Sequence, residues 1–365
     1  MARQKAIAKC VVRGITKYNS PEGRQRRSVF RRTVAAVAAF FALYQVPLDT
    51  VRAEDFTKLR QEVWRIHEEE YLESFQVTDG VKKDGESLRA MSDMGYSGST
   101  FFSTRDQAYL VKSIPRHFEH SFFRDDFLAP YLEYMTKYQD SALIRICDLL
   151  AASQHAIGIT LGLAPSHHIV MENILHGQAD HKQETDPEWQ SFDLKPQSYF
   201  FPERDIADGR LTSEATKSRL ADDFPDKIIL DEHQSADFLG ILERDTKLLQ
   251  DCNAVDYSLF LVRIKIKDRD PFEDPAIVPA GAPFTPPAPP SWRTGIVSPD
   301  GKHVFRAAIL DFFWAKHKMQ PKLMTGLIKA WNLIDRQGPM SITTTAEEYR
   351  TRFLSMVKEL IEIKK

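Results

Sequence analysis

Two apolar runs, each with an aspartate at one end, constrain this chain most. The first begins at Asp256 and continues to Ile266, and the second runs from Val304 to Asp311. Both are rich in β-branched and bulky apolar residues, which predicts strands. Pairing them as an antiparallel hairpin would bring the two carboxylates to the same end. Two carboxylates held together are costly unless a cation or a proton lies between them, which favours metal-assisted chemistry. The alternative is one buried acid with backbone partners and one exposed acid.

A turn of small residues lies earlier in the chain and leaves backbone N–H groups open to a phosphate. It contains Gly95, Ser97, Gly98 and Ser99. Phe101 and Phe102 follow as a strand, and a second strand from Ala108 to Ile114 carries Lys112. A glycine loop between antiparallel strands, with a lysine on the next strand, is how a kinase covers ATP and holds its phosphates. An ordinary hairpin turn beside a solvated lysine is the alternative.

Two helices are predicted around this segment. Apolar residues recur at helical spacing from Asp55 to Phe75 and again from Phe118 to Tyr138. Glu119 lies near the start of the second helix and is the candidate to pair with and orient Lys112, with Asp125 as the alternative.

Two further strands are predicted after the second helix. The first alternates apolar residues from Ala156 to Leu163, and the second runs from Ile169 to Ile174. A strand of this second kind is where a two-lobed kinase places its hinge. The histidines nearby match no metal-ligand spacing and are predicted to be exposed; they are His167, His168, His176 and His181.

The overall composition is that of an ordinary globular protein. The chain has 365 residues, 42% of them hydrophobic, and a formal net charge of −2, so nothing in the balance requires nucleic acid. Cys10, Cys147 and Cys252 are too scattered for a disulfide framework or a zinc site, which indicates a reducing compartment.

The first 32 residues carry ten basic residues against a single acid, Glu22. Such an arm would be attracted to an anionic surface at about 1 kcal/mol per basic residue close to it. A solvated tail and an organelle transit peptide are the alternatives. The apolar run that follows, Thr33 to Tyr44, is shorter than the roughly 20 residues of a membrane-spanning helix, so a packed or interfacial helix is expected.

From about Phe56 onward the chain resembles the phosphatidylinositol phosphate kinase family, in the superfamily that shares its core with SAICAR synthase. The resemblance rests on short motifs in the family's order: Leu59-Arg-Gln-Glu-Val-Trp, Tyr71-Leu-Glu-Ser-Phe, Gly95-Tyr-Ser-Gly-Ser-Thr-Phe-Phe, Leu110-Val-Lys-Ser-Ile, Ile169-Val-Met-Glu-Asn-Ile, Phe192-Asp-Leu-Lys, Glu243-Arg-Asp, Val255-Asp-Tyr-Ser-Leu-Phe, Ile309-Leu-Asp, Met340-Ser-Ile-Thr and Tyr349-Arg-Thr-Arg-Phe.

The resemblance implies a role for each site residue. Lys112 would hold the ATP phosphates beneath the glycine loop. Asp256 would be the catalytic aspartate, and Asp311, together with Asp256, would bind Mg²⁺. Asp193 and Lys195 would support the phosphate site. At the hinge, the nucleotide would be bordered by Met171, Glu172 and Asn173.

The resemblance also implies how the substrate is recognised. The basic stretch after Asp311 would be the loop that reads the inositol head group, with Lys316, Lys318 and Lys322 as its phosphate contacts. Three departures from the family pattern put phosphate binding and turnover in doubt: Tyr96 where the family has a basic residue, and Pro196 and Gln197 where it has glycine and serine. Proline removes a backbone donor that would otherwise face phosphate.

We therefore expect an α+β protein with the two-lobed, SAICAR synthase-like kinase fold and antiparallel sheets in both lobes. Its expected parts are a basic arm with a short apolar helix (1–54), an N-lobe (55–175) and a C-lobe (176–365). The C-lobe would contain a mobile proline-rich insert (268–300) and the specificity loop (about 312–340).

The expected activity is ATP- and Mg²⁺-dependent phosphorylation of a phosphoinositide, from phosphatidylinositol 4-phosphate to phosphatidylinositol 4,5-bisphosphate. The protein would be cytoplasmic and peripheral, at the cytosolic face of an anionic membrane, with no nucleic-acid partner and with a homodimer left open. Two alternatives remain: a weak or inactive scaffold that binds phosphoinositides, and a soluble inositol-phosphate kinase.

Overall fold

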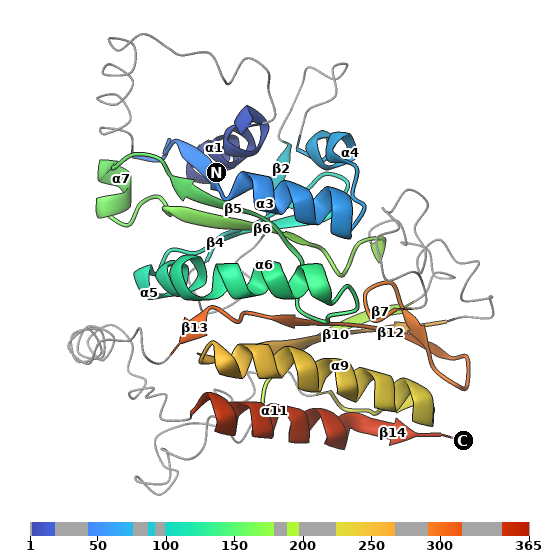
Figure 1. Cartoon of the computed structure of the whole chain (residues 1–365). Coiled ribbons are helices and arrows are strands. Elements are labelled where there is room, and N and C mark those ends of the chain that lie inside the picture. The colour runs from blue at the N-terminus through green and yellow to red at the C-terminus, as the bar shows by residue number, and fades with distance from the viewer. Residues whose placement is uncertain are drawn as a thin grey trace, which may run out of the picture.

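The computed structural model describes residues 2–18, 43–75, 87–91, 99–178, 188–196, 224–266, 291–315 and 345–364. These residues form a mixed α+β structure built on two separate antiparallel sheets, as expected. Figure 1 shows the first sheet in the upper half and the second in the lower half, with helix α6 (Leu128–Lys137) running between them.

The first sheet has six strands, and every neighbouring pair in it is antiparallel. Its strands, in spatial order, are β1 (Leu48–Val51), β5 (Ile146–Ala152), β6 (His167–Glu172), β4 (Tyr109–Ser113), β3 (Phe101–Thr104) and β2 (Leu88–Ala90). The two strands predicted on either side of the 104–107 turn are confirmed as β3 and β4. Because β4 lies inside the sheet, the position of Lys112 is fixed by hydrogen bonds on both sides of its strand.

Residues 2–18 are not a solvated arm. They form helix α1 (Ala2–Tyr18), which buries Ile7, Val11 and Ile15 and contacts β1, β5 and β2. At Gly14 a Cβ atom would lie 3.2 Å from the Leu48 Cβ, so a larger residue here would require its neighbours to shift. Strand β1 pairs with β5, so residues 48–51 are part of the first sheet, and the division expected at residue 54 stays a prediction. The predicted apolar helix at 33–44 lies almost wholly outside the described residues.

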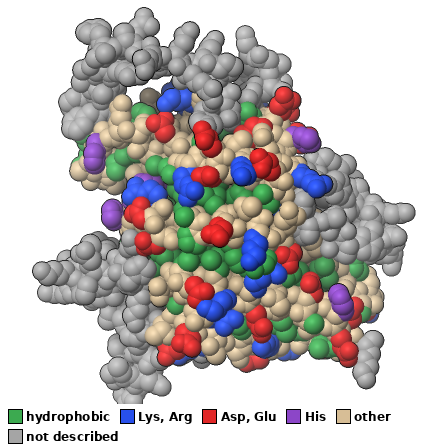
Figure 2. Space-filling view, in the orientation of Figure 1, with side chains coloured by type: hydrophobic (Ala, Val, Ile, Leu, Met, Phe, Trp, Pro, Cys, Tyr) green, Lys and Arg blue, Asp and Glu red, His purple; other side chains and the backbone are tan. Residues whose placement is uncertain are grey.

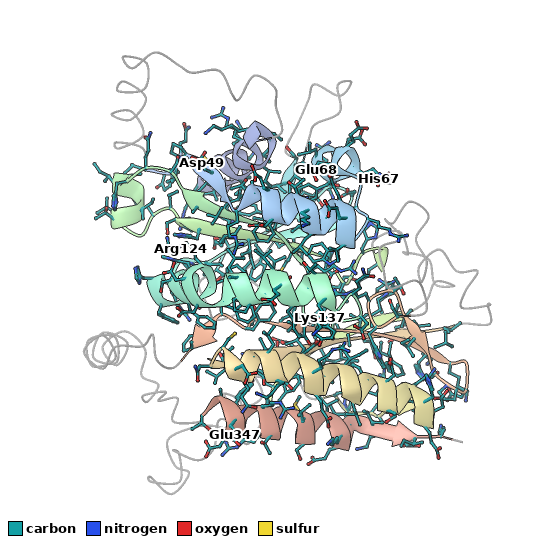
Figure 3. The ribbon with its side chains drawn as sticks, in the orientation of Figure 1. Asp49, His67, Glu68, Arg124, Lys137 and Glu347 are labelled. Atoms are coloured by element: carbon teal, nitrogen blue, oxygen red, sulfur yellow. The ribbon has the colours of Figure 1, made fainter. Side chains whose placement is uncertain are left out.

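The single helix predicted from Asp55 to Phe75 is broken in two. Helix α3 (Ala53–Lys58) continues into the π-helix η2 (Leu59–Val63), and a new helix, α4, spans Glu68–Glu73. The break lets the chain double back, so that Glu68 accepts two hydrogen bonds from the buried Arg60 guanidinium. Figure 3 labels Glu68 where α4 begins. The sequence pattern missed the break because the apolar spacing continues through it.

The second predicted helix is confirmed in its extent and its buried face. Helix α5 (His117–Ser121) runs through the π-helix η3 (Phe122–Phe127) into α6, whose third residue, Pro130, has no backbone N–H to donate. The predicted inward residues are all buried: Phe122, Leu128, Tyr131 and Met135.

The second sheet has four strands in the order β11 (Ile296–Val297), β12 (His303–Leu310), β10 (Ser258–Lys265) and β7 (Glu188–Leu194), again all antiparallel. Helix α9 (Glu232–Asp251) is capped by Asp231. It packs against α11 (Ala346–Leu360), whose cap is Thr345. One small pair, β8 (Ile228–Leu230) with β14 (Ile361–Ile363), is parallel.

The segment between α6 and β5 fastens the two halves together. Its Ala142 carbonyl accepts a 2.7 Å hydrogen bond from the Ile309 N–H, and the Ile144 N–H donates to the Ile309 carbonyl at 3.1 Å. The buried Asp245 of α9 accepts from the Ala142 N–H and from the Tyr134 hydroxyl, each at 2.6 Å. The end of β12 is therefore held against the first half of the molecule.

Two other sequence predictions fail. Ala156–Leu163 is not a strand: it contains the short helix α7 (Ile157–Thr160) at the tip of the β5–β6 hairpin. His167 and His168 are not exposed but buried in β6, and burial lowers the pKa of each to about 3. The proline-rich insert lies outside the described residues up to 290. Its last part is packed, with Trp292 stacked on Phe238 at 3.7 Å between ring centroids.

Candidate active site

Three candidate residues lie at one end of the second sheet because of its strand directions. β10 is central and antiparallel to both neighbours, so its start lies beside the ends of β12 and β7. Asp256 precedes β10, Asp311 directly follows β12, and Lys195 directly follows β7. The hairpin predicted from the two apolar runs is thus present, with both carboxylates at the same end.

A one-residue irregularity shapes this end of the hairpin. After β12 and β10 separate, pairing resumes between β13 (Trp314–Ala315) and β9 (Ala254–Val255), with Trp314 opposite Val255. Three residues (311–313) lie on one strand between the two ladders and only two (256–257) on the other, as in a β-bulge. Both aspartates sit in this irregularity with left-handed backbones, φ 65° at Asp256 and 63° at Asp311. Bulges of this kind redirect side chains, here the two acids.

Aromatic packing fixes the residues next to each acid. Phe312 stacks on Tyr131 of α6, and Phe313 makes an edge contact with Phe123 of η3. On the other strand, the Tyr257 ring packs edge-on against Tyr349 of α11. All six rings are buried, so the acids project from a rigid apolar layer.

Lys112 reaches this end from the first sheet. Its side chain is only 8% exposed, and its ammonium forms an ion pair with the Asp311 carboxylate. The ammonium also lies 5.4 Å from the centre of the Phe101 ring and 5.5 Å from that of Phe313. Burial alone would raise the pKa of the Asp311 carboxyl, but the charges of Lys112 and then Lys195 outweigh it, and the pKa is lowered. Asp311 is therefore ionised near neutral pH.

Lys195 forms the second ion pair of the site. Its ammonium lies 3.0 Å from Oδ1 of Asp256. Burial lowers the pKa of Lys195, but the negative charges of Asp256, Asp311 and Asp193 more than offset it, so the pKa is raised. Asp193 itself is exposed on β7 and adds charge near Lys195. The two lysines and two acids form one alternating cluster.

Glu119 lies near the cluster but makes no ion pair with Lys112 in the described structure. Its carboxylate accepts hydrogen bonds from Trp314 Nε1 at 3.0 Å and Arg116 Nη1 at 3.3 Å. Burial raises the pKa of Glu119, although Arg116, Lys112 and Trp314 each oppose the shift. Asp125, the alternative partner for Lys112, is exposed and pairs with Arg124.

The predicted hinge residues are engaged by the protein itself. Glu172 accepts from the Arg145 N–H at 2.9 Å and forms an ion pair with Arg293. Asn173 donates through its side chain to the Gln107 carbonyl at 2.7 Å and through its backbone to the Ala108 carbonyl at 2.9 Å. Met171 is buried.

Sequence reasoning missed the two arginines that fasten this hinge segment. Arg293 also donates to the Ser141 and Leu143 carbonyls, and the buried Arg306 donates to the carbonyls of Ile174 and His176 at 3.0 Å each. Arg306 was not recognised because it is a single charged residue within an apolar strand. Arg293 was not recognised because it directly follows the proline-rich segment. The sequence signal that could have found Arg306 is an arginine inside a strand predicted to be buried, since such a residue needs hydrogen-bond acceptors nearby.

The remaining candidates are only partly described. Ser99 is buried beside β3, and Pro196 is buried after Lys195. The other residues of interest lie outside the described residues: Gly95, Tyr96, Ser97, Gly98, Gln197, Lys316, Lys318 and Lys322. The structure therefore does not place the glycine loop or the basic loop after β13.

The donor set suits one kind of metal ion. Among the described residues no group of three or more His, Cys, Asp or Glu side chains could hold a metal by itself. Magnesium in phosphoryl-transfer sites is held by one or two carboxylates together with substrate phosphates. Asp311, whose side chain is 42% exposed, and Asp256, 22% exposed, supply hard oxygen donors of this kind.

Comparison with known proteins identifies the family. Residues 82–280 match the family model described as phosphatidylinositol-4-phosphate 5-kinase, a range that contains Lys112, Lys195 and Asp256 but not Asp311. The chain is also 27% identical over 218 residues to a probable phosphatidylinositol phosphate kinase of Dictyostelium discoideum, covering 55% of this chain and 28% of that relative.

The chain belongs to the phosphatidylinositol phosphate kinase family. It matches less than a third of the length of its Dictyostelium relative.

Proposed function

We propose that the chain transfers the γ-phosphoryl group of ATP to a phosphoinositide hydroxyl, converting phosphatidylinositol 4-phosphate to phosphatidylinositol 4,5-bisphosphate. The observation that carries the proposal is the cluster itself. Lys112 and Asp311, 199 positions apart in sequence, form an ion pair beside Lys195 and Asp256. The description of the matching family model supports the choice of substrate.

Each group then has a role that phosphoryl transfer requires. Lys112 would hold the ATP phosphates, and Lys195 would offset the negative charge that grows on the transferred group. Asp256 would accept the proton of the substrate hydroxyl or orient its oxygen. When bound, Mg²⁺ would neutralise phosphate charge, and Asp311 with Asp256 would hold it.

We propose the two-lobed kinase arrangement for the two halves of the molecule, with ATP between the two sheets. Asp193, exposed beside Lys195, would add to the charge that keeps Lys195 protonated. The segment Met171–Asn173 would border the adenine. Because Arg293 and Arg306 hold this segment and its continuation, the nucleotide would meet a preformed hinge.

We further propose that Ser99 with the unplaced Gly95, Ser97 and Gly98 covers the phosphates, and that the lysines after β13 read the head group; these are Lys316, Lys318 and Lys322. None of the helices within the described residues has the length and apolarity needed to cross a membrane. The protein would act as a peripheral protein on a cytosolic membrane surface, as a monomer or a homodimer.

The test compares the wild-type chain with Asp311→Asn. Wild-type protein should transfer ³²P from ATP to phosphatidylinositol 4-phosphate in vesicles when Mg²⁺ is present. Asp311→Asn keeps the side-chain shape but removes the charge that would bind the metal, so turnover should fall about 1000-fold. Asp251→Asn, an exposed carboxylate at the end of α9, is the matched control and should retain full turnover.

Two results would contradict the proposal. Equal turnover in wild type and Asp311→Asn, or turnover in neither, would leave the phosphoinositide-binding scaffold. Turnover on free inositol phosphates that is unaffected when Lys316, Lys318 and Lys322 become alanine would indicate a soluble inositol-phosphate kinase instead.

A further inference from the structure

The tip of the β5–β6 hairpin exposes apolar surface. The tip, Ala156–Pro165, contains no charged residue. Leu161 in this tip is 60% exposed, which makes it the most exposed large hydrophobic residue in the described part of the chain. Ile157, Ile159 and Leu163 beside it are only half-buried. A buried strand would have hidden these residues, but in the structure helix α7 and the turn that follows it leave them partly exposed.

The exposed side of helix α1 is uniformly basic. No acidic residue occurs in the helix, and its exposed basic residues are Arg3, Lys5, Lys9, Arg13 and Lys17. Four of them follow at intervals of four residues, which aligns them along one helical stripe opposite the buried Ile7, Val11 and Ile15. Over the described part of the face in Figure 2, by contrast, basic and acidic side chains are interspersed.

The basic stripe and the apolar tip are structurally continuous. Helix α1 packs on β1 closely at Gly14, where an added Cβ would lie 3.2 Å from Leu48, and Leu48 pairs with Ala152, the last residue of β5 before the tip. The C-terminal half of α1 therefore lies at the base of the hairpin whose end carries Leu161. Lys17 marks this place by its 2.7 Å ion pair with Asp49 of β1.

The tip also lies on the same side of the molecule as one edge of the candidate site. Figure 1 shows α7, α5 and β13 along one side, with β14 and the C-terminus on the opposite side. β13 follows Asp311 and ends at Ala315, where the basic loop begins. A flat surface that contacts the tip would therefore lie on the side from which the basic loop departs.

We propose that the apolar tip and the basic stripe of α1 together form a docking surface for an anionic lipid bilayer. Leu161 would enter the acyl boundary, and the α1 lysines and arginines would lie at the charged head groups. A second copy of this chain fits less well because two uniformly basic stripes repel. The inference rests on the proposed function, since a kinase for phosphoinositides must bring its site to a bilayer.

The test measures membrane binding without the lipid substrate. Vesicles of phosphatidylcholine with phosphatidylserine, lacking phosphoinositides, are sedimented with the full chain. Leu161→Asp should reduce partitioning at least about tenfold, because it puts a charge in place of the leucine that would enter the acyl boundary. Ile363→Asp is the matched control: residue 363 is 53% exposed but lies on β14, on the opposite side (Figure 1), so binding should be unchanged.

A second variant tests the electrostatic part. Lys9→Glu with Arg13→Glu should weaken binding to these vesicles by more than about 20-fold, as expected for two reversed charges, and raised salt should weaken wild-type binding. The charge-reversal variant should bind like wild type to vesicles of phosphatidylcholine alone. Equal binding of wild type and Leu161→Asp to the anionic vesicles would overturn the proposal, and so would a wild-type dimer that Leu161→Asp converts to a monomer.

An activity measurement separates this inference from the proposed function. On short-chain phosphatidylinositol 4-phosphate dispersed below its micellar concentration, Leu161→Asp should turn over like wild type, which also shows that the variant is folded. On vesicles its turnover should fall with its binding. No turnover by wild type on either substrate would sink the proposed kinase activity, while the sedimentation results would still decide the docking surface.

Discussion

The ionic cluster around Arg60 and the cluster at the candidate site both pair basic side chains with carboxylates. They differ in solvent exposure: the first is closed to solvent and the second is open to it. The Arg60 side chain is 2% exposed and contacts two carboxylates, those of Glu68 and Asp148, the latter at 3.1 Å. It also donates to the Cys147 carbonyl, and the Tyr71 hydroxyl donates to Asp148 at 2.6 Å. Every charge in this cluster has protein partners on several sides.

The site cluster is open by comparison. The Asp311 side chain is 42% exposed and pairs with the ammonium of Lys112. Asp256 pairs with Lys195, and both acids hold left-handed backbones, a conformation that costs about 1 kcal/mol for a residue other than glycine. The acids therefore keep oxygen lone pairs for a ligand and carry local strain.

This difference teaches which charges hold the fold and which are available for chemistry. Burial raises the pKa of Asp148, and only its contacts with Arg60 and Tyr71 oppose that rise. The pKa of Asp311 is lowered despite burial because Lys112 and Lys195 face it. Removing a member of the closed cluster should cost stability, whereas removing a member of the open one should cost turnover.

The largest expected effect on stability is that of Arg60→Met. The substitution keeps an apolar stem but leaves Asp148 and Glu68 buried without their cation, so the free energy of unfolding should fall by about 3–5 kcal/mol. Urea denaturation followed by circular dichroism measures it. Lys247→Met, which removes an exposed pair with Asp251, is the control and should change stability by less than about 0.5 kcal/mol. If both variants lost a similar amount of unfolding free energy, the Arg60 cluster would contribute no more to stability than an exposed ion pair does.

A smaller effect is expected from His168→Leu. Both ring nitrogens of His168 lack a hydrogen-bond partner in the described structure, and burial lowers its pKa to about 3 from an ordinary 6.5. The unfolded chain binds a proton below pH 6.5 and the folded chain does not, so wild-type stability is retained above pH 6.5. It should fall by about 1.4 kcal/mol for each pH unit below that, from this residue alone.

His168→Leu should remove that part of the acid dependence and stabilise the protein at neutral pH, because an unpaired polar group is replaced by an apolar one. Denaturation midpoints at pH 7.0, 6.0 and 5.0 test this. An unchanged slope with pH would show that the folded protein accepts the proton at His168.

The sequence predicted which charged residues lie together better than it predicted some of the elements around them. Asp256 and Asp311 could be paired because alternation in two apolar strands sets which end each acid occupies. Lys112 could be placed because a lysine stands out on a short apolar strand. These inferences needed only local patterns and one hairpin.

The predictions that failed concern segments whose structure depends on residues far away in the sequence. The break after Val63 exists because Arg60 binds Glu68 and Asp148, which no spacing within residues 55–75 reveals. The tip at 156–165 alternates like a strand but has no neighbouring strand there, since β1 pairs with β5 only to Ala152. The hinge arginines Arg293 and Arg306 were missed for the same reason.

The smallest effect on stability, with a large one on turnover, is expected from Asp256→Gly. Glycine adopts the φ of 65° without strain, so the substitution should raise the free energy of unfolding by about 1 kcal/mol. Loss of the ion pair between Asp256 and Lys195 should lower it by about the same amount. The free energy of unfolding should therefore change by less than about 1 kcal/mol. Transfer of phosphate to phosphatidylinositol 4-phosphate should fall at least about 100-fold, because the group that would take the hydroxyl proton is gone. A loss of stability as large as that of Arg60→Met would show instead that Asp256 belongs with the charges that hold the fold.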